Sequence, residues 1–121
     1  MLQTLTTPRG ETLSGTPWQV YPRPQMRRDS YINLNGEWDF AVSSEKPATF
    51  DMGITVPFCP ESRLSGIGRH FEEGAPLWYR RKFVLPEGFR RERVLLHIGA
   101  ADQTAEVFVN GQPLCRHEGG Y

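Results

Sequence analysis

The chain has 121 residues and no formal net charge at neutral pH, because 14 basic residues balance 14 acidic ones. This length fits one domain with a modest core. The charge balance excludes a strong attraction to nucleic acid or to an anionic membrane, and no apolar run reaches the roughly 18 residues of a membrane span.

The first 30 residues predict an extended arm rather than a packed element. They contain four prolines, at positions 8, 17, 22 and 24, and show little periodicity. We expect Trp18 and Tyr21 to anchor this arm to the body of the protein, residues 31–121. The opening also lacks a basic segment followed by an apolar one, which argues against a secretory signal and for a cytoplasmic location.

Beyond the arm, short apolar runs keep a period of two, which is typical of strands with one wet face. GEWDFAV, residues 36–42, predicts a strand with Trp38, Phe40 and Val42 on its apolar side. GITVPF, residues 53–58, predicts a short strand that is ended by its proline.

Two further runs show the same alternation. LWYRRKFVLP, residues 77–86, places Tyr79 and Phe83 on one face, although Arg81 falls on that apolar face and breaks the pattern. RVLLHIG, residues 93–99, also alternates and predicts another strand.

The last segment predicts a hairpin. Apolar residues alternate through 105–109, and Asn110-Gly111 is the dipeptide that best tolerates the positive φ of a two-residue turn. Leu114 then begins the return strand. With about six short strands and no long helical period, the sequence predicts an all-β fold, a sandwich or a barrel.

Residues 57–76 form a long connection rich in proline and glycine, and a loop of this length is more often functional than accidental. Its Glu72-Glu73 pair could supply an acid and a base for glycoside cleavage. In so polar a loop, the pair is better interpreted as a solvated turn.

The histidines and cysteines give little sign of chemistry. His70, His97 and His117 are far apart, so a metal site would require them to converge with an acidic residue, and ordinary hydrogen-bonded histidines are the simpler interpretation. Cys59 and Cys115 are too few for a disulfide framework, and we expect buried free thiols. No nucleophile elbow, phosphate loop or dinucleotide motif is present, so no cofactor and no metal is expected.

Four segments in this order carry a resemblance: YPRPQMRRDSYINLNGEWDFAV, VPFCPESRLSGI, LWYRRKFVLP and RVLLHIGAADQTAEVFVNGQPLCRHEGGY. Together they resemble the amino-terminal sugar-binding domain of glycoside hydrolase family two, the β-galactosidase and β-glucuronidase group. Each piece alone is weak, but their order and spacing over residues 21–121 make the likeness specific.

The resemblance implies a jelly-roll β-sandwich that precedes an immunoglobulin-like sandwich and a catalytic (β/α)8 barrel in the same parent chain. The implied reaction is retaining hydrolysis of a β-glycoside by two glutamates about 5 Å apart. In the family the acid/base glutamate follows an asparagine, whereas Asn33, Asn35 and Asn110 are followed here by Leu, Gly and Gly. The resemblance therefore implies a non-catalytic domain.

In the family, the loop after the strand that resembles VPF approaches the mouth of the barrel's active site. Cys59, Pro60, Glu61 and Ser62 are therefore the candidates for lining a substrate subsite, with Glu61 and Ser62 as its polar members. The alternative is that this loop only packs against the barrel. The sequence does not indicate which β-glycoside the parent cleaves.

A jelly roll has about eight strands, so the resemblance predicts a truncated fragment that lacks about two of them at the C-terminal end. Unpaired edges would then favour self-association. The competing function is a free-standing carbohydrate-binding or protein-interaction module, which would display a platform of exposed aromatics. The sequence does not assign Trp18, Trp38 or Trp78 to such a platform, and the alternation of Trp38 with Phe40 and Val42 favours core packing for it.

Overall fold

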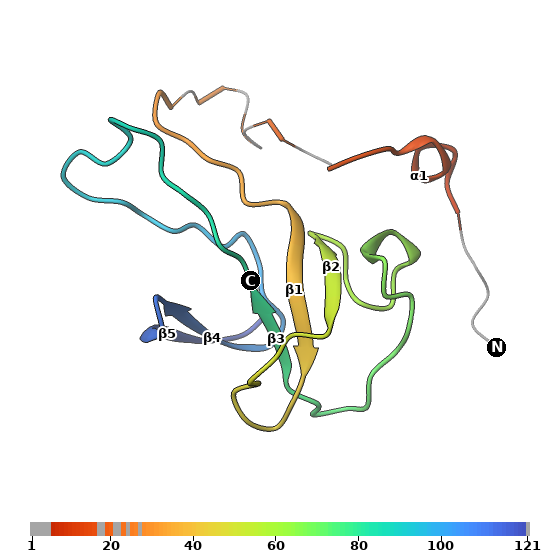
Figure 1. Cartoon of the computed structure of the whole chain (residues 1–121). Helices are drawn as coiled ribbons and strands as arrows, with labels where there is room; N and C mark the ends of the chain where they lie inside the picture. Colours follow the sequence, from red (N-terminus) through yellow and green to blue (C-terminus); the bar gives the residue numbers. More distant parts are fainter. Residues whose placement is uncertain (1–5, 17–18, 21–22, 24, 27, 121) are drawn as a thin grey trace. The chain divides into compact units, whose positions relative to one another are not determined.

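The computed structural model describes residues 6–16, 19–20, 23, 25–26 and 28–120 (Figure 1). The chain divides into two compact units, Met1–Val84 and Leu85–Tyr121, and each is described by itself. Trp18 and Tyr21, the expected anchors of the arm, lie outside the described residues.

The all-β class is confirmed. The first unit contains a three-stranded antiparallel sheet of order β2-β1-β3, built from β1 (Gly36–Val42), β2 (Met52–Val56) and β3 (Leu77–Arg80). The second unit contains an antiparallel pair, β4 (Thr104–Val109) and β5 (Gln112–Glu118). The antiparallel sheets are consistent with a β-sandwich, while the jelly-roll order of strands stays a prediction.

The core of the first unit is formed by β1 and β2. Phe40 and Ile54 are fully buried, and Ala41 is 3% exposed. The predicted bounds of this strand are confirmed, but the inward placement of Val42 is wrong, because Val42 is 37% exposed. Val42 pairs with Leu77 at the end of the sheet, where both side chains extend past the core.

Of the other predicted strands, one is confirmed, one is shorter than expected and one is absent. The strand predicted at 53–58 is present as β2 and ends before its proline. The strand predicted at 77–86 pairs only over Leu77–Arg80, and Phe83 beyond it is 51% exposed. Residues 93–99 form no strand, so the described residues contain five strands rather than six. Alternation makes a strand only where a neighbouring strand takes up the backbone hydrogen bonds, and this segment has none.

The arm contains one helical turn, α1 (Pro8–Thr12), where an extended segment was expected. The reason is local: the Thr7 side chain accepts a hydrogen bond from the Gly10 N–H at 3.1 Å, and Pro8 suits the first helical position. A side chain at Gly10 would lie 3.8 Å from Leu64, and Thr16 approaches Gly36, so the arm contacts the body of its unit. The division into an arm, 1–30, and a sandwich stays a prediction.

The hairpin of the second unit is confirmed. Asn110 and Gly111 have φ values of 50° and 78°, the positive pair that a two-residue turn between twisted strands requires. On one face of the pair, Arg116 lies 3.4 Å from Glu106 and 2.9 Å from Glu118. Across the described part of the chain the α-helix has five residues, too short to cross a membrane.

Candidate functional site: the loop after β2

The loop that follows β2 is held together by one buried hydroxyl. Ser65 is 1% exposed, and its Oγ lies 2.7 Å from the carbonyl oxygen of Ser62 and 3.2 Å from that of Pro60. The same Oγ accepts a hydrogen bond from the Ile67 N–H at 3.0 Å. The single hydroxyl hydrogen thus lies within reach of two backbone carbonyls, while the oxygen accepts from a third residue of the loop.

A single 3-10 turn, η1 (Arg63–Ser65), forms the middle of this loop. Ser62 caps its start, because its Oγ accepts from the Leu64 N–H at 3.2 Å. Gly66 ends it in the left-handed region at φ 83°, where glycine has no steric cost. The loop closes where the Arg69 N–H donates to the Pro60 carbonyl at 3.2 Å.

The four candidate residues occupy this loop in different ways. Pro60 is buried, and Ser62 is half-buried with its hydroxyl engaged as the cap. Cys59 and Glu61 are exposed, and they alone among the four turn reactive or charged atoms toward solvent. That these four residues line a substrate subsite stays a prediction.

The expectation of buried thiols is wrong. Cys59 and Cys115 are free and both are exposed. Cys59 lies in a surface loop, and Cys115 lies on a strand of the two-stranded sheet, where the side chains of that strand remain largely accessible.

Glu61 interacts electrostatically with His70 and with Tyr79. Its Oε1 lies 3.6 Å from Nδ1 of His70, in an exposed pair that contributes little to stability. Tyr79, on β3, packs edge-on against Phe40 with ring centroids 5.1 Å apart. Burial raises the pKa of Tyr79, and the charges of Glu61 and Cys59 raise it further. We call Cys59, Glu61, His70 and Tyr79 the loop cluster.

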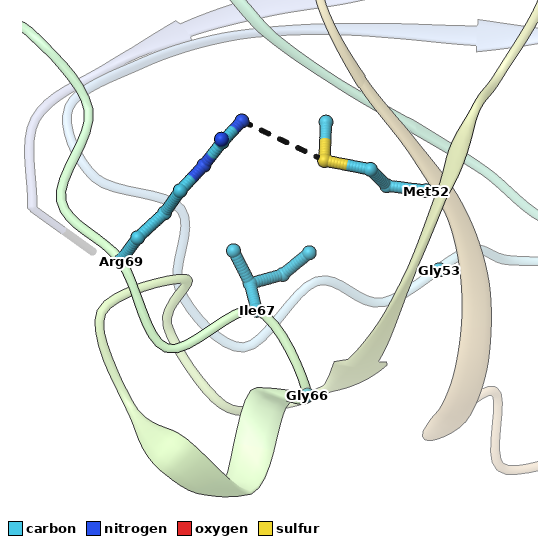
Figure 2. A pocket seen from close by; sticks show the side chains of 5 residues that line it. All are labelled: Met52, Gly53, Gly66, Ile67 and Arg69. Atoms are coloured by element: carbon cyan, nitrogen blue, oxygen red, sulfur yellow. Dashed lines mark hydrogen bonds between the residues drawn. The ribbon is translucent and has the colours of Figure 1, made fainter.

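A hollow of about 280 Å³ opens beside the same loop (Figure 2). It is bordered by two residues of β2 and three of the loop: Met52, Gly53, Gly66, Ile67 and Arg69. Sequence reasoning missed these residues. Three of them, Gly66, Ile67 and Arg69, lie in the Gly-Ile-Gly-Arg run at 66–69, whose glycines were the signal in the sequence.

The remaining acids and histidines form no obvious reaction centre. Glu72 and Glu73 lie exposed in a turn closed by a 3.1 Å bond from the Ala75 N–H to the Glu72 carbonyl, as the solvated-turn interpretation predicts. Among the described residues, no three His, Cys, Asp or Glu side chains cluster so as to hold a metal ion. The buried Nε2 of His117 has no hydrogen-bond partner among them, so the expectation of an ordinary hydrogen-bonded histidine is not met at this atom.

The two tryptophans in the described residues, Trp38 and Trp78, form hydrogen bonds that stabilise the sheet. Both are half-buried, and each donates its indole N–H to a backbone carbonyl: Trp38 to Leu34 at 2.7 Å and Trp78 to Ser43 at 2.9 Å. These bonds tie irregular segments to β1 and β3, and Trp38 is half-buried rather than part of the buried core, which consists of Phe40, Ala41 and Ile54. Trp18 lies outside the described residues.

Comparison with known proteins supports the resemblance. The chain is 48% identical to the human β-glucuronidase over 122 residues and 38% identical to that of Paenibacillus borealis over 114 residues. Each match covers 84% of this chain but 18% of the relative. A β-galactosidase of Thermoanaerobacter pseudethanolicus is 36% identical over 103 residues, or 79% of this chain and 14% of the relative. No family model matches the chain.

Proposed function

We propose that this chain, a homologue of the β-glucuronidases and β-galactosidases of glycoside hydrolase family two, is a non-catalytic part of a retaining β-glycoside hydrolase. The observation that carries this proposal is the match of 84% of the chain to 18% of the human β-glucuronidase. Two glutamates would carry the reaction. Since no asparagine of this chain is followed by glutamate, both would belong to the rest of the parent protein.

The proposed architecture follows the family. The chain would form most of a jelly-roll β-sandwich and would pack against the immunoglobulin-like and (β/α)8 barrel domains of the same parent, in the cytoplasm. A β-linked carbohydrate would be bound by the full-length enzyme. The unpaired sheet edges of this chain would support self-association.

Within this function, the loop after β2 would border the substrate through Cys59, Pro60, Glu61 and Ser62. Its rigidity supports that role, because the Ser65 hydroxyl fixes the backbone on both sides of Glu61. A fixed acceptor selects for a sugar hydroxyl, because the wrong epimer would leave that acceptor without a hydrogen bond. The exposed Glu61 carboxylate is such an acceptor.

The test is Glu61→Ala in the full-length protein. We expect kcat/KM for the preferred nitrophenyl β-glycoside to fall by about tenfold, the loss of one hydrogen bond to a charged group. Glu72→Ala is the matched control, since Glu72 is an exposed carboxylate in a turn of the same loop, and it should leave kcat/KM unchanged. An unaltered kcat/KM in Glu61→Ala would mean that the loop only packs against its neighbours.

A further inference from the structure

The chain contains the dipeptide Asn-Gly twice, at Asn35-Gly36 and at Asn110-Gly111. In this dipeptide the asparagine side chain can react with the backbone, because glycine has no Cβ to block the approach of the carboxamide carbon to the glycine nitrogen. The reaction requires the peptide between the two residues to rotate away from its folded conformation. Its rate at each dipeptide therefore depends on how firmly the fold holds that peptide.

The second dipeptide forms the exposed tip of the hairpin. Asn110 and Gly111 are both exposed, and the ladder of β4 and β5 closes at the pair Val109 and Gln112, so neither turn residue belongs to it. A Cβ built on Gly111 would meet nothing within 4 Å. The peptide that joins Asn110 to Gly111 can therefore rotate without displacing a packed side chain.

The first dipeptide is held by Arg81. Gly36 is buried at the start of β1, where it pairs with Val56. The Arg81 Nη1 donates to the Asn35 carbonyl at 3.2 Å, and a Cβ built on Gly36 would lie 3.1 Å from the same nitrogen. The Asn35 N–H also donates to Oδ1 of Asn33 at 2.8 Å. Rotation of this peptide would break the bond from Arg81, so the fold must open locally before Asn35 can react.

We propose that Asn110 is a site of spontaneous deamidation and that the fold protects Asn35 from the same reaction. The Gly111 nitrogen loses its proton to hydroxide and attacks Cγ of Asn110, which closes a succinimide ring. The bond from Cγ to Nδ2 breaks, and the released nitrogen takes up a proton from water and leaves as ammonia. Water then opens the ring at one of its two carbonyl carbons, which gives aspartate or isoaspartate at position 110.

Isoaspartate changes the hairpin more than aspartate does. It routes the main chain through the side-chain carbon, so that the turn gains a main-chain atom. The register of a hairpin is fixed by the type and length of its turn. Both products also add a negative charge at the tip. Deamidation therefore gives an aged form of the second unit, in which β4 and β5 pair less firmly.

The experiment incubates the 121-residue chain in mildly alkaline buffer and maps its tryptic peptides by mass spectrometry over time. Exchange of the amide nitrogen for oxygen changes the peptide mass, and electron-transfer fragmentation distinguishes isoaspartate from aspartate. We expect Asn110 to be modified at least about tenfold faster than Asn35, because local opening must precede the reaction at the buried dipeptide. Equal rates at the two asparagines in the folded chain would overturn the proposal.

The same chain in concentrated guanidinium chloride is the reference, because unfolding removes the contact of Arg81 with Asn35. There the two asparagines should react at rates within about threefold of each other. A tenfold difference that persists in the unfolded chain would refute the protection of Asn35 by the fold. If the folded chain keeps Asn110 intact over a period in which the unfolded chain is modified there, the site itself is refuted.

Hydrogen exchange of the incubated sample tests the consequence for the hairpin. In the isoaspartate fraction the amides of β4 and β5 should exchange at least about fivefold faster than in the unmodified fraction. The amides of β1 and β2, in the first unit, are the control and should not change. Unaltered exchange in β4 and β5 would refute the effect on the hairpin.

Discussion

Arg81 breaks the alternation of its segment for a structural reason. It is half-buried, and its Nη1 lies 3.1 Å from the carbonyl oxygen of Leu34 and 3.2 Å from those of Asn35 and Glu37. One guanidinium nitrogen thus converges on three backbone acceptors where the chain enters β1. A charged side chain is expected on an otherwise apolar face where backbone carbonyl oxygens need a hydrogen-bond donor.

Arg81→Ala should therefore lower the free energy of unfolding by about 1.5–3 kcal/mol, the usual value for hydrogen bonds to a charged group. Urea denaturation of the chain measures it. Lys82→Ala, at the exposed neighbouring position, is the control and should cost less than about 0.5 kcal/mol. Equal losses in the two variants would show that the convergence on three carbonyls does not stabilise the fold.

Tyr79 reports on the loop cluster. Burial, and then the charges of Glu61 and Cys59, raise its pKa above the usual value of about 10. Because the folded-state pKa is the higher one, the stability linked to Tyr79 is fully present below about pH 10 and is lost as the pH rises through the folded pKa.

Glu61→Gln should lower the pKa of Tyr79 while leaving it above its usual value, because burial is the larger cause. Absorbance near 295 nm, taken as the difference between each protein and its Tyr79→Phe version, isolates this phenol from the other tyrosines. Glu73→Gln serves as the comparison at an exposed turn. A Tyr79 titration that is identical with and without the Glu61 charge would contradict the geometry of the cluster.

At the scale of elements, the hairpin depends on its turn. Gly111 has a φ of 78°, where an L-residue is strained, and Asn110 precedes it at 50°. Gly111→Ala should cost about 1 kcal/mol and should speed amide exchange in β4 and β5. Gly120→Ala, where φ is not left-handed and an added Cβ meets nothing within 4 Å, should change neither quantity.

Sequence and structure agree where the cause is local and diverge where it is not. Asn110-Gly111 specifies its own turn, and Pro57 ends β2, so both were predictable. Residues 93–99 carry the same alternation as β1, yet no strand pairs with them. The same holds for the candidate site. The loop could be predicted from its composition and from the family resemblance. The burial of the Ser65 hydroxyl and the stacking of Arg69 on Phe71 could not, because they depend on contacts formed only in the folded chain.

Large apolar side chains are exposed in both units of the chain. Val84 is 87% exposed in the first unit, and Leu95 and Leu114 are 62% and 60% exposed in the second. Within the described residues β2 and β3 each pair on one side only, and so do β4 and β5. Unpaired edges beside apolar surface favour association with another chain.

We therefore expect the 121-residue chain to form dimers or larger species at about 50 µM, measured by size-exclusion chromatography with light scattering. Leu114→Lys, which adds a charge to an exposed position of the edge strand β5, should shift the population toward monomer. Arg116→Lys, on the same strand, keeps the charge and should not. A clean monomer of the unsubstituted chain at this concentration would contradict the prediction.

The proposed role of the chain, a non-catalytic part of a retaining β-glycoside hydrolase, can be tested in one assay. The most direct measurement compares the full-length protein with this chain alone on nitrophenyl β-glucuronide, β-galactoside and β-glucoside, with the anomer of the released sugar followed by proton NMR. We expect the full-length protein to hydrolyse at least one of them and to release the β-anomer first, and we expect the chain alone to hydrolyse none. Turnover by the chain alone, first release of the α-anomer, or a folded full-length protein inert toward all three would contradict it.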